Sequence, residues 1–183
     1  MNKAVQLNKY NNSWYKPGNK LKIVLWYFTN QLILNTFIPF PSFFKRSVLK
    51  LFGAKIGANV VIKPNVNIKY PWFLEIGENT WIGEHVWIDN LCGVSIGKNA
   101  CLSQGSMLLT GNHNFGLETF DLIIKEIVLE DGVWIGAKAI VCPGVICRTH
   151  SLLTVNSVAS TTLDEYTIYR GNPAIPIKKR IIS

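Results

Sequence analysis

Aliphatic residues, with one cysteine among them, recur at every sixth position through most of this 183-residue chain. They stand at Ile56, Ile62, Ile68, Ile76, Ile82, Ile88, Ile96, Leu102, Leu108, Leu129, Ile135, Val141, Cys147, Leu153 and Ala159. A period of six fits neither the 3.6-residue period of a helix nor the alternation of a two-faced sheet. It predicts a chain that turns a corner every six residues, so that each side is a short strand with one inward side chain. Three sides make one coil, and stacked coils bury a continuous aliphatic column.

This six-residue ladder slips by two residues at 71–75 and again at 91–95. Because the two slips are twenty residues apart, we expect both to lie on the same corner of successive coils, as stacked bulges. Glycine follows several ladder residues, as at Gly57, Gly77 and Gly97. We expect these glycines at corners whose backbone needs a positive φ.

Residues 21–52, before the ladder, are apolar and aromatic, but polar residues and two prolines, Pro39 and Pro41, interrupt them. The pattern predicts two helices, roughly 20–37 and 42–52, rather than one membrane span. Residues 1–74 hold eleven Lys or Arg and no Asp or Glu, whereas residues 75–183 hold eight basic and eleven acidic residues. Three interpretations stay open: helices that cap the coil stack, a basic aromatic surface at an anionic membrane, or a solvated basic face.

Other features restrict the class of protein. We expect no nucleic-acid partner, because no recognition motif is present and the aromatic residues lie in apolar runs. No secretory leader opens the chain, which favours a cytoplasmic location. The four cysteines form no C-x-x-C pair, so we expect them to be small buried side chains and expect no structural metal.

The chain leaves the ladder once, between Leu108 and Leu129, which are 21 positions apart where three whole steps would be 18. Residues 111–126 show no six-residue pattern, and they open with Gly-Asn-His-Asn-Phe-Gly at 111–116. Loops on rigid scaffolds commonly hold binding and catalytic residues. An imidazole titrates near neutral pH and can take a proton from a hydroxyl group. His113 is therefore the candidate catalytic residue.

Several short motifs follow one another in a fixed order. They are Ser-Gln-Gly at 103–105, Leu-Thr-Gly-Asn-His at 109–113, Val-Trp-Ile-Gly-Ala at 133–137, Pro-Gly-Val at 143–145 and Gly-Asn-Pro-Ala at 171–174. Together with Leu-Phe-Gly-Ala-x-Ile-Gly at 51–57, they closely resemble the O-acetyltransferase branch of the hexapeptide-repeat family, and within it the acetyltransferases of colanic acid and other exopolysaccharides. The resemblance implies an all-β, left-handed parallel β-helix at 56–163, a helical and basic extension at 1–55 and a C-terminal tail at 164–183.

The resemblance also implies the chemistry. It makes His113 the general base of an acetyltransferase whose donor is acetyl-CoA, bound in a groove between neighbouring coils of a homotrimer. It assigns cofactor contacts to Gly136, Ala137, Val155, Ser160, Thr161 and Lys178. Trp134 is a further candidate, which either lines the groove or packs outward. Candidates for binding the hydroxyl groups of a sugar or glycan acceptor are Glu84, Asp89 and Asn90, one coil below the loop, and Asn112 beside His113. The chain departs from the family pattern at 147–148, 155–156 and 161–162, all on the expected cofactor side.

Alternatives remain open for the activity. The acceptor is a glycan hydroxyl in one interpretation and serine or a nucleotide-sugar amine in another, and the basic N-terminal part favours a membrane-proximal, lipid-linked glycan. A γ-class carbonic anhydrase would bind zinc with three histidines, but His85, His113 and His150 lie too far apart to resemble its pattern. A non-catalytic β-helix would be expected to lack the loop histidine.

Overall fold

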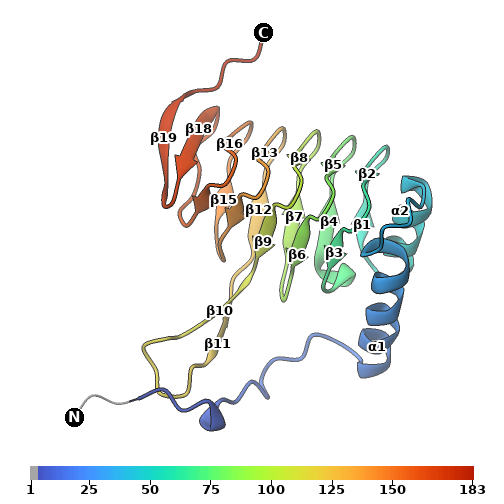
Figure 1. Ribbon diagram of the computed structural model, residues 1–183, viewed down its shortest axis with the longest axis vertical. Helices are drawn as coiled ribbons and strands as arrows, with labels where there is room; N and C mark the ends of the chain where they lie inside the picture. Colours follow the sequence, from blue (N-terminus) through green and yellow to red (C-terminus); the bar gives the residue numbers. More distant parts are fainter. Residues whose placement is uncertain (1–3) are drawn as a thin grey trace.

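The computed structural model describes residues 4–183 and shows a three-sided prism of short strands with helices at one end (Figure 1). Residues 1–3, the start of the expected N-terminal extension, lie outside the described residues. Sheet 1 holds β1 (Lys55–Ile56), β4 (Leu74–Ile76), β7 (Val94–Ile96), β12 (Ile127–Leu129) and β15 (Ile146–Cys147). Sheet 2 holds β2 (Val61–Ile62), β5 (Trp81–Ile82), β8 (Cys101–Leu102), β13 (Trp134–Ile135), β16 (Leu152–Leu153), β18 (Thr167–Gly171) and β19 (Ala174–Lys179). Sheet 3 holds β3 (Asn67–Ile68), β6 (Trp87–Asp89), β9 (Met107–Leu109), β14 (Ile140–Val141) and β17 (Val158–Ala159).

The ladder residues form the core of the prism. All fifteen ladder side chains are buried. Each pairs in parallel with its counterpart one coil away, as Ile62 does with Ile82 and Ile82 with Leu102. Burying an aliphatic side chain stabilises the fold by about 1.5–3 kcal/mol before entropic costs, so the column is the main source of stability. The predicted class, an all-β parallel β-helix, is confirmed.

The glycines after the ladder residues have a different role from the expected one. Positive φ falls three residues after a ladder residue, more often on asparagine than on any other residue type, at Asn59, Asn65, Asn79, Asn99 and Asn156. Gly57, Gly77, Gly83, Gly97 and Gly136 do not have a positive φ. A Cβ atom at these glycines would lie 2.5–2.7 Å from an atom of another coil, mostly backbone. The expectation that these glycines provide a positive φ was therefore wrong. Glycine is needed at these positions because neighbouring coils approach too closely for a side chain.

The departures from the ladder stack along one edge of the prism, between sheets 3 and 1. β3 leads to β4 through a 3₁₀ turn at Pro71–Phe73, and β6 leads to β7 through residues 90–93. The two slips thus lie on the same corner of successive coils, as predicted. Buried Asn90 ties the two corners together, because its side chain donates to the Tyr70 carbonyl at 2.6 Å and accepts from the Tyr70 N–H at 3.0 Å.

The two expected helices are present near the first coil. α1 (Lys20–Thr29) continues as a π-helical turn (Asn30–Leu34), and α2 spans Ser42–Leu51. The first helix ends at Leu34, three residues earlier than expected. It ends there because the Leu34 and Thr36 carbonyls accept hydrogen bonds from the N–H groups of Val66 and Asn65 on the first coil.

Basic residues of α2 close the open end of sheet 2. Lys45 is 0% exposed and donates to the carbonyl of Lys63 at 2.8 Å, and Arg46 donates to the carbonyl of Val60 at 2.7 Å. Burial lowers the pKa of Lys45. Backbone carbonyls at the edge of a sheet need partners, so these two cations cap the stack, as one interpretation of the extension predicts.

Three further segments complete the described chain. Residues 4–18, here called the strap, include a 3₁₀ turn (Leu7–Lys9) and run beside the hairpin β10 (Gly111–His113) and β11 (Leu122–Ile124) toward α1 (Figure 1). β18 and β19 pair antiparallel beyond the last complete coil. Within residues 4–183, no helix combines the length and the apolar character needed to cross a bilayer.

Candidate active site

The excursion from the ladder is a β-hairpin that projects from the edge between sheets 3 and 1 (Figure 1). β10 pairs antiparallel with β11, and His113 stands opposite Leu122 at the far end of the pairing. Lys125 at the base of the hairpin donates its backbone N–H to the Thr110 carbonyl at 2.9 Å. The pairing therefore fixes His113 on a strand, beyond the surface of the prism.

The contacts of His113 fix its ring. Nδ1 lies 2.9 Å from the carbonyl oxygen of Phe120, and the His113 and Phe120 rings stack at 4.3 Å and 6°. The Tyr10 ring of the strap lies near it, with the centroids 5.6 Å apart. A carbonyl oxygen only accepts hydrogen bonds, so Nδ1 carries the proton and Nε2 is the basic nitrogen of the neutral ring.

His113 borders a cleft of about 610 Å³. The cleft is lined by Tyr10, Asn12, Tyr15, Pro17, Lys69, Tyr70, Asp89, Leu91, Gly111, Asn112, His113 and Leu122. The walls thus come from the strap, from the edges of the first two coils and from the hairpin. An ion pair lies in the wall, with Lys69 Nζ 3.0 Å from Asp89 Oδ1. Hydroxyl, amide and charged groups around a concave space are the features of a small-molecule site.

Of the four expected acceptor residues, two line this cleft. Asp89 is at the end of β6, and exposed Asn112 is next to His113, whose N–H it accepts at 2.8 Å. Asn90 is buried, and both ends of its amide are engaged by Tyr70. Glu84 lies on the corner between β5 and β6, on another edge of the prism. The structure thus brings Asp89 and Asn112 together with His113, but not Asn90 or Glu84.

The sequence analysis missed the strap. Tyr10, Asn12 and Tyr15 line the cleft, although they lie about 100 positions from His113 in the sequence. The Tyr15 hydroxyl donates to the Leu91 carbonyl at 2.5 Å, and burial raises the pKa of Tyr15, so it stays a donor. The only signal in the sequence is a cluster of tyrosine and asparagine at 10–15, which does not show which surface it covers.

The expected cofactor residues are spread over other parts of the prism. Trp134 faces outward from sheet 2 and donates its indole N–H to Ser103 Oγ at 2.9 Å. Gly136, Ala137 and Val155 lie on the edge between sheets 2 and 3. Ser160 and Thr161 are exposed and lie on the edge that carries the hairpin, two coils further on. On a single chain, most of these residues and His113 therefore occupy different edges.

The basic cluster at 178–180 is divided by its contacts. Lys179 Nζ donates to Thr167 Oγ1 at 3.0 Å, and Arg180 donates to the Gly132 carbonyl at 3.0 Å. Lys179 therefore ties β19 to β18, and Arg180 holds the C-terminal segment to the coils of the prism. Lys178 is exposed on β19, opposite Ile168. It is the member of the cluster available to bind an anionic group.

The three histidines occupy separate places. His85 and His150 are at corners with φ values of 58° and 55°, and His113 is on the hairpin. In residues 4–183, no three His, Cys, Asp or Glu side chains are grouped so that they could hold a metal ion. The three-histidine zinc site of the carbonic anhydrase alternative is not formed within one chain.

Comparisons with known proteins identify relatives of this chain. No family model matches the chain. The chain is 34% identical over 167 residues to the protein named "Putative colanic acid biosynthesis acetyltransferase WcaF" of Escherichia coli strain K12, which covers 91% of this chain and 92% of that protein. It is also 24% identical over 138 residues to the galactoside O-acetyltransferase of the same strain. That alignment covers 74% of this chain and 68% of the galactoside O-acetyltransferase.

Solved structures share the fold. A hexapeptide-repeat-containing acetyltransferase from Vibrio cholerae superposes with a TM-score of 0.80 at 20% identity, covering 87% of this chain and 91% of that one. The structure of that protein with acetyl coenzyme A has a TM-score of 0.75 at 21% identity, covering 82% of this chain and 83% of that one. Since the 34% identity to a colanic acid biosynthesis acetyltransferase extends over nine-tenths of both chains, the chain belongs to the hexapeptide-repeat acetyltransferase family, among the relatives named for exopolysaccharide biosynthesis.

Proposed function

We propose that this chain transfers an acetyl group from acetyl-CoA to a hydroxyl group of a sugar in an exopolysaccharide or another cell-surface glycan. The observation that carries the proposal is the hydrogen bond between His113 Nδ1 and the Phe120 carbonyl. This bond leaves Nε2 as the basic nitrogen, at a cleft lined by tyrosine, asparagine and aspartate. Two relatives, named for colanic acid biosynthesis and for O-acetylation of galactosides, support a sugar hydroxyl as the acceptor.

In the proposed reaction, His113 Nε2 removes the proton of the acceptor hydroxyl as its oxygen attacks the carbonyl carbon of the thioester. The carbon–sulfur bond then breaks, and the thiolate of coenzyme A takes the proton from the imidazolium. The products are the O-acetyl ester and free coenzyme A, and the ring returns to its starting state. General base catalysis of this kind contributes about 10²–10⁴-fold in rate.

Two faces of the prism are suited to contact other copies of the chain. The outward residues of sheet 2 include Val61, Trp81, Trp134 and Leu152, and those of sheet 3 in the coils beyond β6 include Met107, Ile140 and Val158. Sheet 1 begins instead with outward Lys55 and Glu75, which form an ion pair at 2.6 Å. A heterologous contact between two different faces closes into a ring when the rotation between copies allows it, and a ring of three copies would be the expected homotrimer.

A trimer would also complete the site. The edge that carries Gly136, Ala137 and Val155, with Trp134 beside it on sheet 2, would then lie in a groove beside the hairpin of a neighbouring copy. We propose that acetyl-CoA occupies this groove, with Lys178 and the hydroxyl groups of Ser160 and Thr161 as further contacts. A flexible lysine suits a phosphate group as a point charge.

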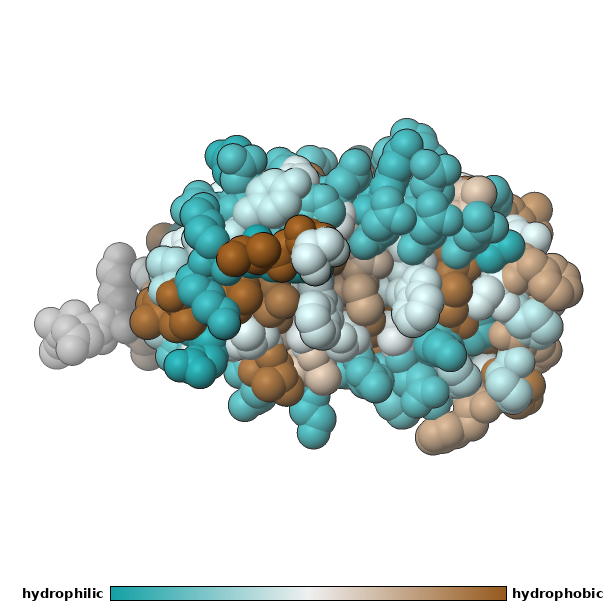
Figure 2. Space-filling model, turned by 90° about the horizontal axis from the view of Figure 1, so that it is seen from above, coloured by the Kyte–Doolittle hydropathy of each residue, from teal (hydrophilic) through white to brown (hydrophobic). Residues whose placement is uncertain are grey.

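The helical end is suited to a membrane surface. Apolar side chains exposed there include Leu21, Val24, Leu25, Phe28, Leu32, Phe37, Ile38, Phe43 and Leu51. In Figure 2, hydrophobic residues are visible at the right-hand end, where the helices lie, as well as on the opposite side of the molecule. Residues 1–74 carry no acidic residue. We propose that this end rests on the anionic cytoplasmic face of a membrane, where a lipid-linked glycan is available.

Flotation with phosphatidylglycerol vesicles tests the membrane proposal. The wild type should float with the vesicles, and the double variant Phe37→Ser, Phe43→Ser should not. A wild type that does not float would contradict the membrane proposal.

Calorimetry and a thioester assay test the main proposal. We expect the wild type and His113→Ala to bind acetyl-CoA equally, with transfer to a glycan slower by about 10²–10⁴-fold in His113→Ala. His85→Asn is the matched control, because asparagine suits the positive φ of that corner. Failure of the wild type to bind acetyl-CoA would overturn the proposal. Transfer to serine or to the amine of an amino sugar, and not to a sugar hydroxyl, would show that the proposed acceptor is wrong.

A further inference from the structure

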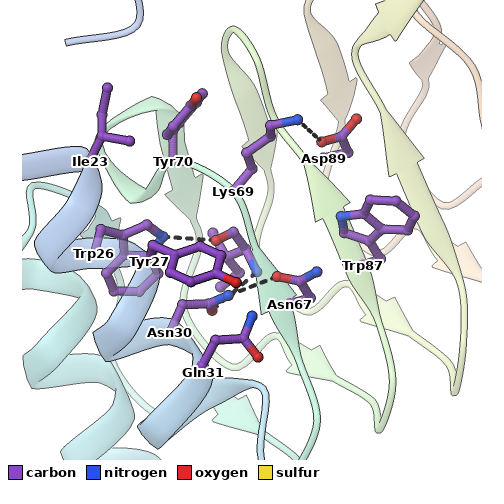
Figure 3. Close-up of a pocket in the computed structure, with 11 residues that line it drawn as sticks. Ile23, Trp26, Tyr27, Asn30, Gln31, Asn67, Lys69, Tyr70, Trp87 and Asp89 are labelled. Carbon is purple, nitrogen blue, oxygen red and sulfur yellow. Dashed lines mark hydrogen bonds and ion pairs between the residues drawn. The ribbon is translucent and has the colours of Figure 1, made fainter. Parts of the chain in front are cut away.

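A second cavity adjoins the cleft at His113. It has a volume of about 250 Å³ and lies between α1 and the outward face of sheet 3 (Figure 3). Lys69, Tyr70 and Asp89 line both cavities. The two spaces therefore meet at the ion pair between Lys69 and Asp89, and together they run from the hairpin to α1.

The floor of the second cavity is firmly held. The Trp26 indole N–H donates to the Ile68 carbonyl at 2.9 Å, and Asn30 Nδ2 donates to Asn67 Oδ1 at 2.8 Å. Trp26 and Asn30 are almost completely buried. These bonds fix α1 against β3, so the cavity is a preformed part of the fold.

The side chains at the mouth of this cavity are aromatic and neutral polar. Tyr27 is 61% exposed and Trp87 is 38% exposed. Figure 3 shows the Tyr27 hydroxyl directed toward Asn67, and the Asn67 amide nitrogen directed toward Trp87 and away from Asn30. Gln31, on the π-helical turn that continues α1, also lines the cavity (Figure 3).

This set of groups matches a neutral sugar ring. The faces of aromatic rings pack against the apolar C–H faces of a pyranose, while amides and hydroxyls both donate to and accept from its hydroxyl groups. The one charged pair, Lys69 with Asp89, is balanced. A phosphate or nucleotide would need unpaired cations, which this lining does not offer.

We infer that the acceptor is an oligosaccharide rather than a single sugar. While one sugar presents its hydroxyl group to His113, the neighbouring sugar of the same glycan occupies the cavity beneath α1, between Tyr27 and Trp87. This inference rests on the proposed function and adds a second sugar subsite to it. It also predicts that α1, which caps the first coil, takes part in acceptor selection.

Acetyl transfer to graded acceptors tests the inference. The probes are de-O-acetylated oligosaccharides of colanic acid and other bacterial exopolysaccharides, each compared with the methyl glycosides of its component sugars. We expect the wild type to prefer an oligosaccharide, and Tyr27→Ala and Trp87→Ala to raise the acceptor KM for it by about 5–10-fold, the size of one lost aromatic contact. The kcat, the KM for acetyl-CoA and transfer to methyl glycosides should be unchanged.

Lys20→Ala is the control, because Lys20 is exposed on the same helix and does not line the cavity. Equal use of methyl glycosides and oligosaccharides by the wild type would overturn the subsite while leaving the proposed function intact. An equal loss with both acceptors in Tyr27→Ala, or a change of oligomeric state in sedimentation, would also overturn it, because the cavity would then serve folding or assembly. A wild type that acetylates none of the glycans would overturn both proposals.

Discussion

At the scale of single residues, two kinds of corner residue meet two different physical demands. At Gly77, a Cβ atom would lie 2.6 Å from the backbone of Gly97 and Lys98 on the next coil. Asn99, three residues after ladder residue Ile96, has a φ of 53°, and its backbone N–H donates to the Glu78 carbonyl at 3.0 Å. The first position excludes any side chain, whereas the second requires only a residue that tolerates a left-handed backbone.

The two positions should therefore respond oppositely to small substitutions. Gly77→Ala should destabilise the fold by about 1–3 kcal/mol, the usual cost of forcing a methyl group into a packed site. Asn99→Gly should change stability by less than about 1 kcal/mol, because glycine adopts this φ freely. Thermal unfolding of both variants beside the wild type measures the difference, and equal losses would show that the corner backbone, not the coil contact, sets the glycine requirement.

This difference shows that a sequence predicts where the corner residues stand better than it predicts which physical requirement each one meets. The ladder marks each corner, since Gly77 and Asn99 stand one and three residues after Ile76 and Ile96. A repeat alone cannot separate a residue kept small by its neighbour from one kept flexible by its φ. That choice depends on the distance between coils, which only the three-dimensional structure gives.

At the scale of elements, the strap is the part of the site that no local pattern could reveal. It is held by contacts that are long-range in sequence: the Gln6 N–H donates to the Glu118 carbonyl at 2.8 Å, and the Trp72 indole donates to the Pro17 carbonyl at 2.7 Å. His113 could be predicted because the hairpin interrupts a regular ladder. The strap precedes the ladder and interrupts nothing, so the sequence gives no sign that it covers the hairpin.

The strap should contribute to acceptor binding through Tyr10, whose ring lies 5.6 Å from that of His113. Tyr10→Ala should raise the KM for the glycan acceptor by about tenfold, equivalent to about 1.4 kcal/mol, while the KM for acetyl-CoA stays unchanged. Leu7→Ala is the control, because Leu7 is an exposed strap residue that does not line the cleft. Steady-state kinetics with each substrate varied in turn separate the effects, and a loss confined to kcat would instead make Tyr10 a positioning residue for His113.

At the scale of the whole molecule, the two halves of the expected site lie on different edges of one prism. His113 is on the edge between sheets 3 and 1, and Ala137 is on the edge between sheets 2 and 3. The ladder predicts the prism, and the interruption of the ladder predicts the place of the candidate base. A repeat carries no information about which edge of the prism faces another copy. The apolar outward rows of sheets 2 and 3 supply that information only once the strands are in place.

If a neighbouring copy joins the two edges, two inactive variants should restore activity to each other. His113→Ala removes the base, and Ala137→Trp fills the proposed cofactor groove, so each variant alone should be almost inactive. In mixed trimers, a site that takes its histidine from one variant and its groove from the other is intact. Each mixed trimer holds two copies of one variant and one of the other, so about one third of its sites should be intact, because each site draws one part from each of two copies. Co-expression with two different tags, sequential affinity purification and the glycan transfer assay measure this recovery. Mixed trimers that stay as inactive as the parents would place the whole site within one chain, and the cofactor would then have to bind along the hairpin edge near Ser160 and Thr161.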